Sequence, residues 1–127
     1  MTRLLLVCFG GAFGAGARYL VATWGARALG SDFPRGTLLV NASGSFLMGV
    51  LVAALSGRPG SDHIRLFLGA GVLGGYTTYS SFNAETLALA GSGRAGAAAV
   101  YVATTLVLGV AAGLAGLVAG RLLAGHP

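Results

Sequence analysis

The sequence predicts an all-α integral membrane protein of four transmembrane helices, with the third helix broken near its middle. Its 127 residues are 55% hydrophobic and only 9% charged, with a mean hydropathy of +0.81, whereas about a quarter of the residues in soluble domains are charged. Four segments are apolar over the roughly 20 residues that a helix needs to cross a bilayer. Short connectors containing Gly, Pro, Ser and Asp separate them, and these residues are typical of turns.

The four predicted spans form one domain, residues 1–127. They are residues 4–26, 36–57, 64–90 and 95–120. The first is interrupted only by Arg18, the third carries Arg65 at its edge and Glu85 well inside, and the other two contain no charge. The N-terminal stretch is also similar to a signal peptide. We favour a retained first helix because the apolar character resumes after Arg18.

The net charge of +5 comes from eight arginines, spread singly along the chain, against three acidic residues. This spacing is typical of charges that border membrane spans and not of a nucleic-acid patch. Four spans put both termini on one side. The arginines of that side are Arg3, Arg58, Arg65 and Arg121, and those of the other side are Arg27, Arg35 and Arg94. Because this balance gives little orientation signal, we expect dual topology and an antiparallel homodimer, with a weakly oriented monomer as the alternative.

Glycines recur at helical spacing in two of the predicted spans. In the fourth span, Gly109, Gly113, Gly116 and Gly120 are four, three and four residues apart. In the first, the pair at positions 10 and 14 forms a GxxxG motif. Small faces let helix backbones approach closely in lipid. The pattern therefore predicts tight helix packing and oligomerisation.

The third span contains the stretch GVLGGYTTYSSFNAE, in which two glycines precede two threonines. Gly74 and Gly75 weaken the helix, and the β-branched Thr77 and Thr78 favour extended backbone. A break here frees backbone groups at mid-membrane depth, which is tolerated only where they are buried in protein or line a polar site. Freed carbonyls can coordinate a cation. The alternative is a simple kink in which threonine hydroxyls bond back to the helix.

Polar residues inside the spans are candidates for function, because burying them without partners costs free energy. Asn41 and Ser45 share a face of the second helix, and Tyr101 and Thr105 share a face of the fourth. The Asn41 amide can donate to an anion, or it can make an interhelical hydrogen bond. Arg18 is either a buried counter-charge or a side chain that reaches an interface.

Beyond the predicted break, Tyr79 and Phe82 are three residues apart and project from one face. Aromatic ring edges are electropositive, so two such edges can line a path for a small anion, although core packing is the commoner role. Ser80, Ser81 and Glu85 stand beside them. An acid within a span marks an ion path by default.

Three stretches together resemble a known family, the small bacterial fluoride channels called Fluc or CrcB. They are GGAFGAGARY in the first span, GTLLVNASGSFLMG in the second and GGYTTYSSFNAE in the third, and the resemblance extends over the whole chain. It implies a dual-topology homodimer in the bacterial plasma (inner) membrane, with two pores. The implied function is passive, selective fluoride efflux that lowers cytoplasmic fluoride toxicity.

The resemblance also implies roles for individual residues. A central structural sodium ion would be held by the backbone carbonyls of Gly74 and Thr77, and Arg18 would be an accessory charge. The implied fluoride pore consists of Asn41, Tyr79, Phe82, Ser80, Ser81, Glu85, Tyr101 and Thr105. Tyr79 departs from the family, which usually has Phe there, and Ser81 replaces Thr. Gly109 stands where some members carry a further hydroxyl.

Three other classes of protein are weighed against this one. A small multidrug exporter needs a carboxylate in its first helix, and this chain has none there. A structural or assembly subunit that transports nothing would tolerate apolar replacement of Asn41. An enzyme is the least favoured class, because no nucleophile–base pair is present and both His63 and His126 lie outside the spans. No nucleotide-binding motif is found, so transport is expected to be passive.

Overall fold

The computed structural model describes residues 1–125, and these form helices and connecting turns only. Its three long helices are α1 (Thr2–Leu29), α2 (Arg35–Ala54) and α6 (Ala95–Ala124). Between α2 and α6 the chain forms α3 (Asp62–Ile64), η1 (Arg65–Leu73), α4 (Gly74–Tyr76) and α5 (Tyr79–Gly91). His126 lies outside the described residues. The predicted all-helical fold is confirmed.

The helices have the length and surface of membrane spans. α1, α2 and α6 are each long and apolar enough to cross a bilayer. Large apolar side chains on α1 and α6 point outward, among them Phe13, which is 67% exposed, and Val107, also 67% exposed. A surface of this kind is stable against lipid and not against water. The protein is therefore a multi-pass membrane protein.

The third predicted span is not one helix. Its first half contains a nine-residue π-helix, η1, which the sequence did not predict. A π-helix bonds each N–H to the carbonyl five residues back, which widens the helix, and it is rare outside functional segments. After α4 the chain leaves the helix and resumes as α5. For this reason only three helices in the described part of the chain qualify as spans by length.

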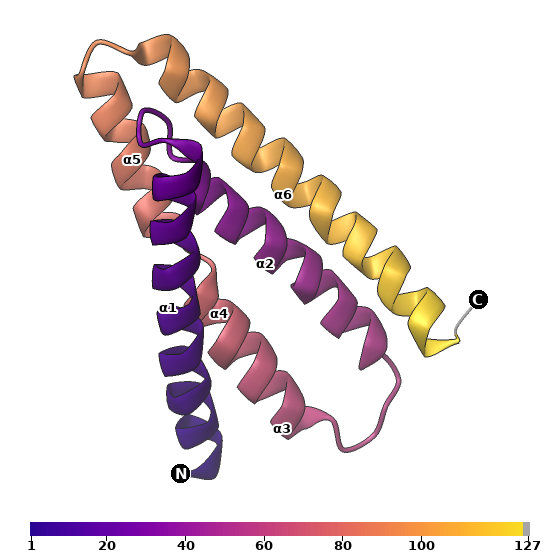
Figure 1. Ribbon diagram of the computed structural model, residues 1–127. Coiled ribbons are helices and arrows are strands. Elements are labelled where there is room, and N and C mark those ends of the chain that lie inside the picture. The colour runs from indigo at the N-terminus through magenta and orange to yellow at the C-terminus, as the bar shows by residue number, and fades with distance from the viewer. Residues whose placement is uncertain (126–127) are drawn as a thin grey trace.

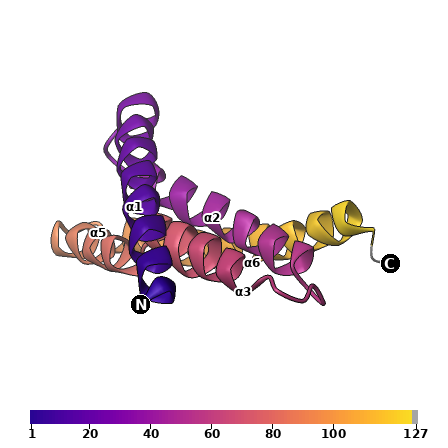
Figure 2. The ribbon, with the colours of Figure 1, turned by 90° about the horizontal axis from the view of Figure 1, so that it is seen from below.

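The elements are arranged around α2 (Figure 1). α2 and α6 run parallel and lie side by side, and theirs is the most extensive contact in the molecule. α1 packs against η1 and α4, while α5 packs against the first turns of α6. Seen from below, α1 projects away from the layer that the other helices form (Figure 2). The break between α4 and α5 thus faces α2.

Two glycines show why these helices can approach so closely. A Cβ on Gly14 of α1 would lie 2.0 Å from the Val72 carbonyl oxygen, and a Cβ on Gly116 of α6 would lie 2.0 Å from the Phe46 carbonyl oxygen. Any side chain at either position would force the backbones apart. The predicted glycine faces are confirmed as helix contacts, of α1 with η1 and of α6 with α2. In lipid, van der Waals packing of this kind holds helices together.

Candidate functional site

The predicted break is present, at Thr77 and Thr78. Their backbone dihedrals are φ −74°, ψ 155° and φ −148°, ψ 124°, so both residues are extended. The Thr78 hydroxyl caps α5 by accepting a hydrogen bond from the Ser81 amide at 3.2 Å. The Thr77 hydroxyl donates to the Leu73 carbonyl at 3.0 Å. One threonine therefore bonds back to the helix, as in the kink alternative, yet the helix is interrupted all the same.

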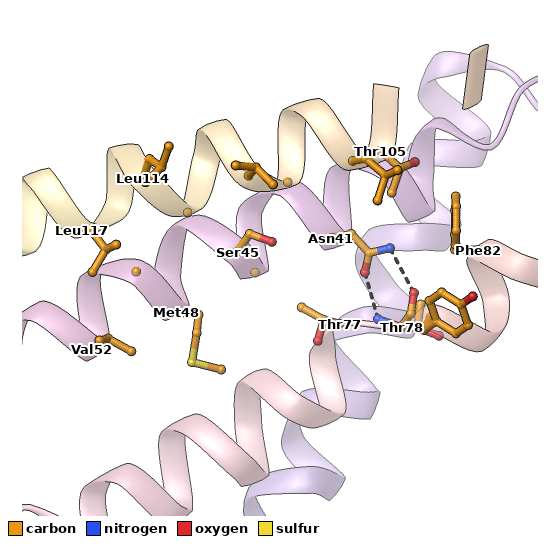
Figure 3. A pocket seen from close by; sticks show the side chains of 17 residues that line it. Asn41, Ser45, Met48, Val52, Thr77, Thr78, Phe82, Thr105, Leu114 and Leu117 are labelled. Atoms are coloured by element: carbon orange, nitrogen blue, oxygen red, sulfur yellow. Dashed lines mark hydrogen bonds between the residues drawn. The ribbon is translucent and has the colours of Figure 1, made fainter. Parts of the chain in front are cut away.

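Asn41 of α2 holds the broken segment. Its Nδ2 donates to the Thr78 carbonyl at 3.0 Å, and its Oδ1 accepts from the Thr78 amide at 2.8 Å (Figure 3). These are the interhelical hydrogen bonds that were the structural alternative for this residue. A primary amide has two N–H donors, and only one of them is used on Thr78. Asn41 also lines a pocket between α2 and α6, the larger of the two pockets described below.

The same bonds release two backbone carbonyls. In a continuous α-helix the Thr78 amide would donate to the Gly74 carbonyl, and the Ser81 amide would donate to the Thr77 carbonyl. Here the two amides donate instead to the Asn41 side chain and to the Thr78 hydroxyl. The Gly74 and Thr77 carbonyls therefore lose their helical partners. Carbonyl oxygens are suitable ligands for a hard cation, so the donor set fits a sodium ion.

The larger pocket, of about 650 Å³, lies between α2, α6 and the break (Figure 3). Its polar groups gather near the break, and its remaining lining is apolar. Asn41, Ser45, Thr77, Thr78 and Thr105 supply the polar groups. The Thr105 hydroxyl is buried and has no hydrogen-bond partner within residues 1–125. A buried hydroxyl without a partner costs about 1–3 kcal/mol.

Four aromatic rings form a contiguous set that begins at the lining of the larger pocket. Tyr79 lies 5.8 Å from Phe82 between ring centroids, and Phe82 lies 5.2 Å from Tyr101. Phe33 meets Tyr101 edge to face at 5.4 Å. The two predicted pore aromatics are therefore adjacent, but their settings differ. Phe82 belongs to a buried core cluster and is 9% exposed, whereas Tyr79 is 78% exposed.

Glu85 of α5 is hydrogen-bonded to hydroxyl groups on two other helices. Its Oε1 accepts from the Thr37 hydroxyl at 2.7 Å, and its Oε2 accepts from the Tyr101 hydroxyl at 2.6 Å. Both hydroxyl side chains are buried. The half-buried Glu85 carboxyl group therefore has two hydrogen-bond partners, and it lines a second pocket of about 360 Å³.

Thr37 was not predicted from the sequence. It stands four residues before Asn41, which stands four before Ser45. The three side chains therefore follow one face of α2, and extending the step of four by one turn would have found Thr37. What the sequence could not supply was its partner, because Glu85 is 48 residues away.

The remaining predicted residues are Ser80, Ser81 and Arg18. Ser80 and Ser81 lie at the start of α5, and the Thr78 hydroxyl lies 3.3 Å from the Ser80 oxygen and 3.1 Å from the Ser81 oxygen. Neither serine lines the larger pocket. Arg18 is half-buried in α1 and lines neither of the two pockets. The structure thus groups the predicted polar residues around the break and leaves Arg18 apart.

The fold and the site together define a small, multi-pass, all-helical membrane protein with a polar site at a broken helix. Residues 5–117 match the family described as CrcB-like protein, Camphor Resistance (CrcB). The chain belongs to this family.

Two relatives match this chain over nearly its full length. It is 58% identical over 126 residues to a protein of Anaeromyxobacter dehalogenans strain 2CP-1 named fluoride-specific ion channel FluC, covering 98% of this chain and 100% of the relative. It is 48% identical over 124 residues to a protein of the same name from Agrobacterium fabrum, covering 97% of this chain and 99% of the relative. The predicted family resemblance is confirmed.

We expect Asn41→Leu to destabilise the protein by about 2–4 kcal/mol, because the Thr78 amide and carbonyl would both be left without partners in an apolar setting. The loss is measured as the fall in melting temperature of the purified protein in detergent. Ser45→Ala, one turn along the same face, is the matched control and is expected to change the melting temperature little. Equal melting of Asn41→Leu and wild type would contradict the role assigned to Asn41.

Proposed function

We propose that this protein is a fluoride-selective channel in the bacterial plasma (inner) membrane. Fluoride would leave the cell through it passively, down its gradient, which lowers cytoplasmic fluoride toxicity. The observation that carries the proposal is the 58% identity, over essentially the full length, to a protein named fluoride-specific ion channel FluC. The arrangement of donors at the break supports it independently. A channel of this kind catalyses no reaction.

The chemistry of fluoride explains why such donors suit it. Fluoride is small and strongly hydrated, so a selective path must replace its water with closely spaced donors. At the larger pocket these donors are the free N–H of Asn41 and the unpartnered hydroxyl of Thr105. The hydroxyls of Thr37 and Tyr101 each donate their one hydrogen to Glu85, so in the proposal they can donate to the ion only when that carboxyl group releases them. An ion that moves from Asn41 towards this group would meet the electropositive edge of Phe82.

Tyr79, Ser80 and Ser81 belong to the mouth of this path in the proposal. The Tyr79 ring is adjacent to Phe82 but 78% exposed. Its hydroxyl offers the ion a donor that a phenylalanine would not. The two serines and the Thr78 hydroxyl form one hydrogen-bonded group at the start of α5. A hydrated ion can exchange water for such hydroxyls before it reaches the narrow part.

We expect purified protein in liposomes to release fluoride and to retain chloride. A fluoride electrode records the release, and a chloride electrode records the control under the same gradient. Donors that are closely spaced around a small ion hold the larger chloride poorly, which is the physical reason for the difference. Folded protein that releases no fluoride would falsify the channel assignment and favour the assembly-subunit alternative. Equal release of both ions would remove the selectivity from the proposal.

We expect Phe82→Ile to reduce the fluoride flux by about tenfold or more. The variant removes the ring edge, and losing about 1.5 kcal/mol of favourable contact with the ion corresponds to tenfold. Leu89→Ile in the same core cluster is the control for packing. Wild-type flux in Phe82→Ile, with intact folding, would remove this ring from the pore.

The working unit of the proposal is an antiparallel homodimer. Two features of the single chain support it. The Tyr79 ring and the larger pocket are open, and the buried Thr105 hydroxyl lacks a partner among the described residues. A second copy in the opposite orientation would cover these groups, and the balanced arginines allow both orientations. Native mass spectrometry tests this directly, since a mass of one chain only would contradict the dimer.

A structural sodium ion completes the proposal. The Gly74 and Thr77 carbonyls would hold it, because the bonds of Asn41 and Thr78 have freed both. Within residues 1–125 no group of three His, Cys, Asp or Glu side chains could hold a metal instead. When bound, the ion would supply a positive charge that offsets repulsion between anions in the low-dielectric interior.

We expect sodium to raise the melting temperature of the purified protein. A ligand that binds only the folded state stabilises it by about 2.7 kcal/mol at one hundred times its dissociation constant. The comparison is sodium against N-methylglucamine at equal ionic strength. Asn41→Leu, which releases the Thr78 amide, is expected to lose this sodium effect. Identical melting of the wild type in both salts would argue against a sodium site.

A further inference from the structure

We propose that the smaller pocket is an anion vestibule made accessible to anions by Arg35 and Arg94. The ligand class is a small inorganic anion, fluoride in the first place. The inference deepens the proposed function and rests on it. It assigns a role to two arginines that the family resemblance leaves without one.

The pocket lies at one end of the molecule, where the connector between α1 and α2 approaches the start of α6 (Figure 1). Its volume is about 360 Å³. Arg35 is the first residue of α2, and Arg94 directly precedes α6. Both side chains line the pocket and both residues are exposed. They stand at the water-facing end of a cavity whose inner end is formed by membrane-spanning helices.

Both guanidinium groups are positioned by neutral partners. Arg94 donates from one terminal nitrogen to the Asp32 carbonyl at 2.8 Å. Arg35 donates to the Leu29 carbonyl, and its guanidinium carbon lies 6.0 Å from the centroid of the Phe33 ring. Neither guanidinium bonds to a carboxylate in the part of the chain that the structure describes. Each keeps its full positive charge and several free N–H donors.

The inner end of the pocket reaches the candidate ion path. Thr37 and Glu85 line the same cavity as the two arginines. Phe33, which lies beneath Arg35, meets the ring of Tyr101 edge to face. An anion in this pocket is therefore next to the hydroxyl-bearing group around Glu85, with Phe82 and the larger pocket beyond it.

Charge balance gives the arginines their role. Two acidic residues, Asp32 and Glu85, also line the pocket, and their formal charges oppose the entry of an anion. Arg35 and Arg94 offset these two charges, so the lining is formally neutral. Without either arginine the vestibule would be net negative and would exclude fluoride. Without the Asp32 carboxylate it would be net positive and would concentrate fluoride. Opposite substitutions should therefore have opposite effects.

The test is the fluoride current across planar bilayers containing the full-length protein. The variants are Arg35→Gln, Arg94→Gln and Asp32→Asn. Arg27→Gln is the matched control, because this arginine lies on the same predicted side of the membrane but does not line the pocket. A unit charge about 10 Å from an ion in water changes its local concentration by roughly twofold. At about 10 mM ionic strength we expect a twofold decrease for each arginine variant, a twofold increase for Asp32→Asn and no change for Arg27→Gln.

The dependence on salt separates this role from a structural one. In about 1 M of an impermeant salt, screening within about 3 Å should bring all variants to the wild-type current. A merely structural loss of the Arg94–Asp32 contact would persist at high salt. If Arg94→Gln does not fold, Arg35→Gln and Asp32→Asn still carry the test.

Three results would overturn the inference. One is a wild-type current in all three pocket variants. Another is a change of the same sign in the arginine variants and in Asp32→Asn. The third is a change that salt does not remove. In each of these the wild type still conducts fluoride and the proposed function stands. Absence of current in the wild type itself would instead remove the proposed function, and the vestibule with it.

Discussion

The rest of the site depends on the pair of hydrogen bonds between the Asn41 side chain and the Thr78 backbone. An extended segment within an apolar layer has unpaired amides and carbonyls, and lipid offers them no partner. The Asn41 amide satisfies one donor and one acceptor together, at 2.8 and 3.0 Å. It can do so because it lies on α2, the helix that the break faces. The break is thereby a defined structure, and its freed carbonyls have fixed positions.

Close helix packing is the second requirement, and it makes the first one possible. α1 approaches η1 so closely that Gly14 has no room for a Cβ, and α6 approaches α2 in the same way at Gly116. The first half of the broken segment packs against α1, and its second half, α5, packs against α6, which is itself fixed on α2. The described residues form only helices and short connectors, so helix packing supplies their rigidity. Glycines at the contacts matter for this packing, because dispersion contacts between backbones are the main attraction between helices in lipid.

The two pockets are connected through shared residue contacts. Phe82 lines the larger pocket, and Glu85, which accepts a hydrogen bond from the Tyr101 hydroxyl, lines the smaller one. The rings of Phe82 and Tyr101 are 5.2 Å apart between centroids. In the proposed channel, the larger pocket supplies hydrogen-bond donors to the ion, and the smaller pocket, with its two arginines, sets the local charge.

The sequence by itself determined the membrane class, the helical segments and the position of the break. Each follows from local properties: apolar runs of sufficient length, turn residues between them, and Gly74, Gly75, Thr77 and Thr78 in succession. It also placed Asn41 and Ser45 on one face, since that needs only the helical period. The family motif in the third span marked most of the site residues.

Only the tertiary structure decided which polar groups meet. Glu85 takes its two donors from residues 48 and 16 positions away, and Asn41 reaches 37 residues along the chain to Thr78. The tertiary structure also contains a π-helix in part of the third span. In it Phe82 is buried and Tyr79 is exposed. Helical periodicity fixes the face on which a side chain lies but not the helix that packs against it. Crossing angles and close approach between distant segments fix the rest, and they arise only when the helices pack.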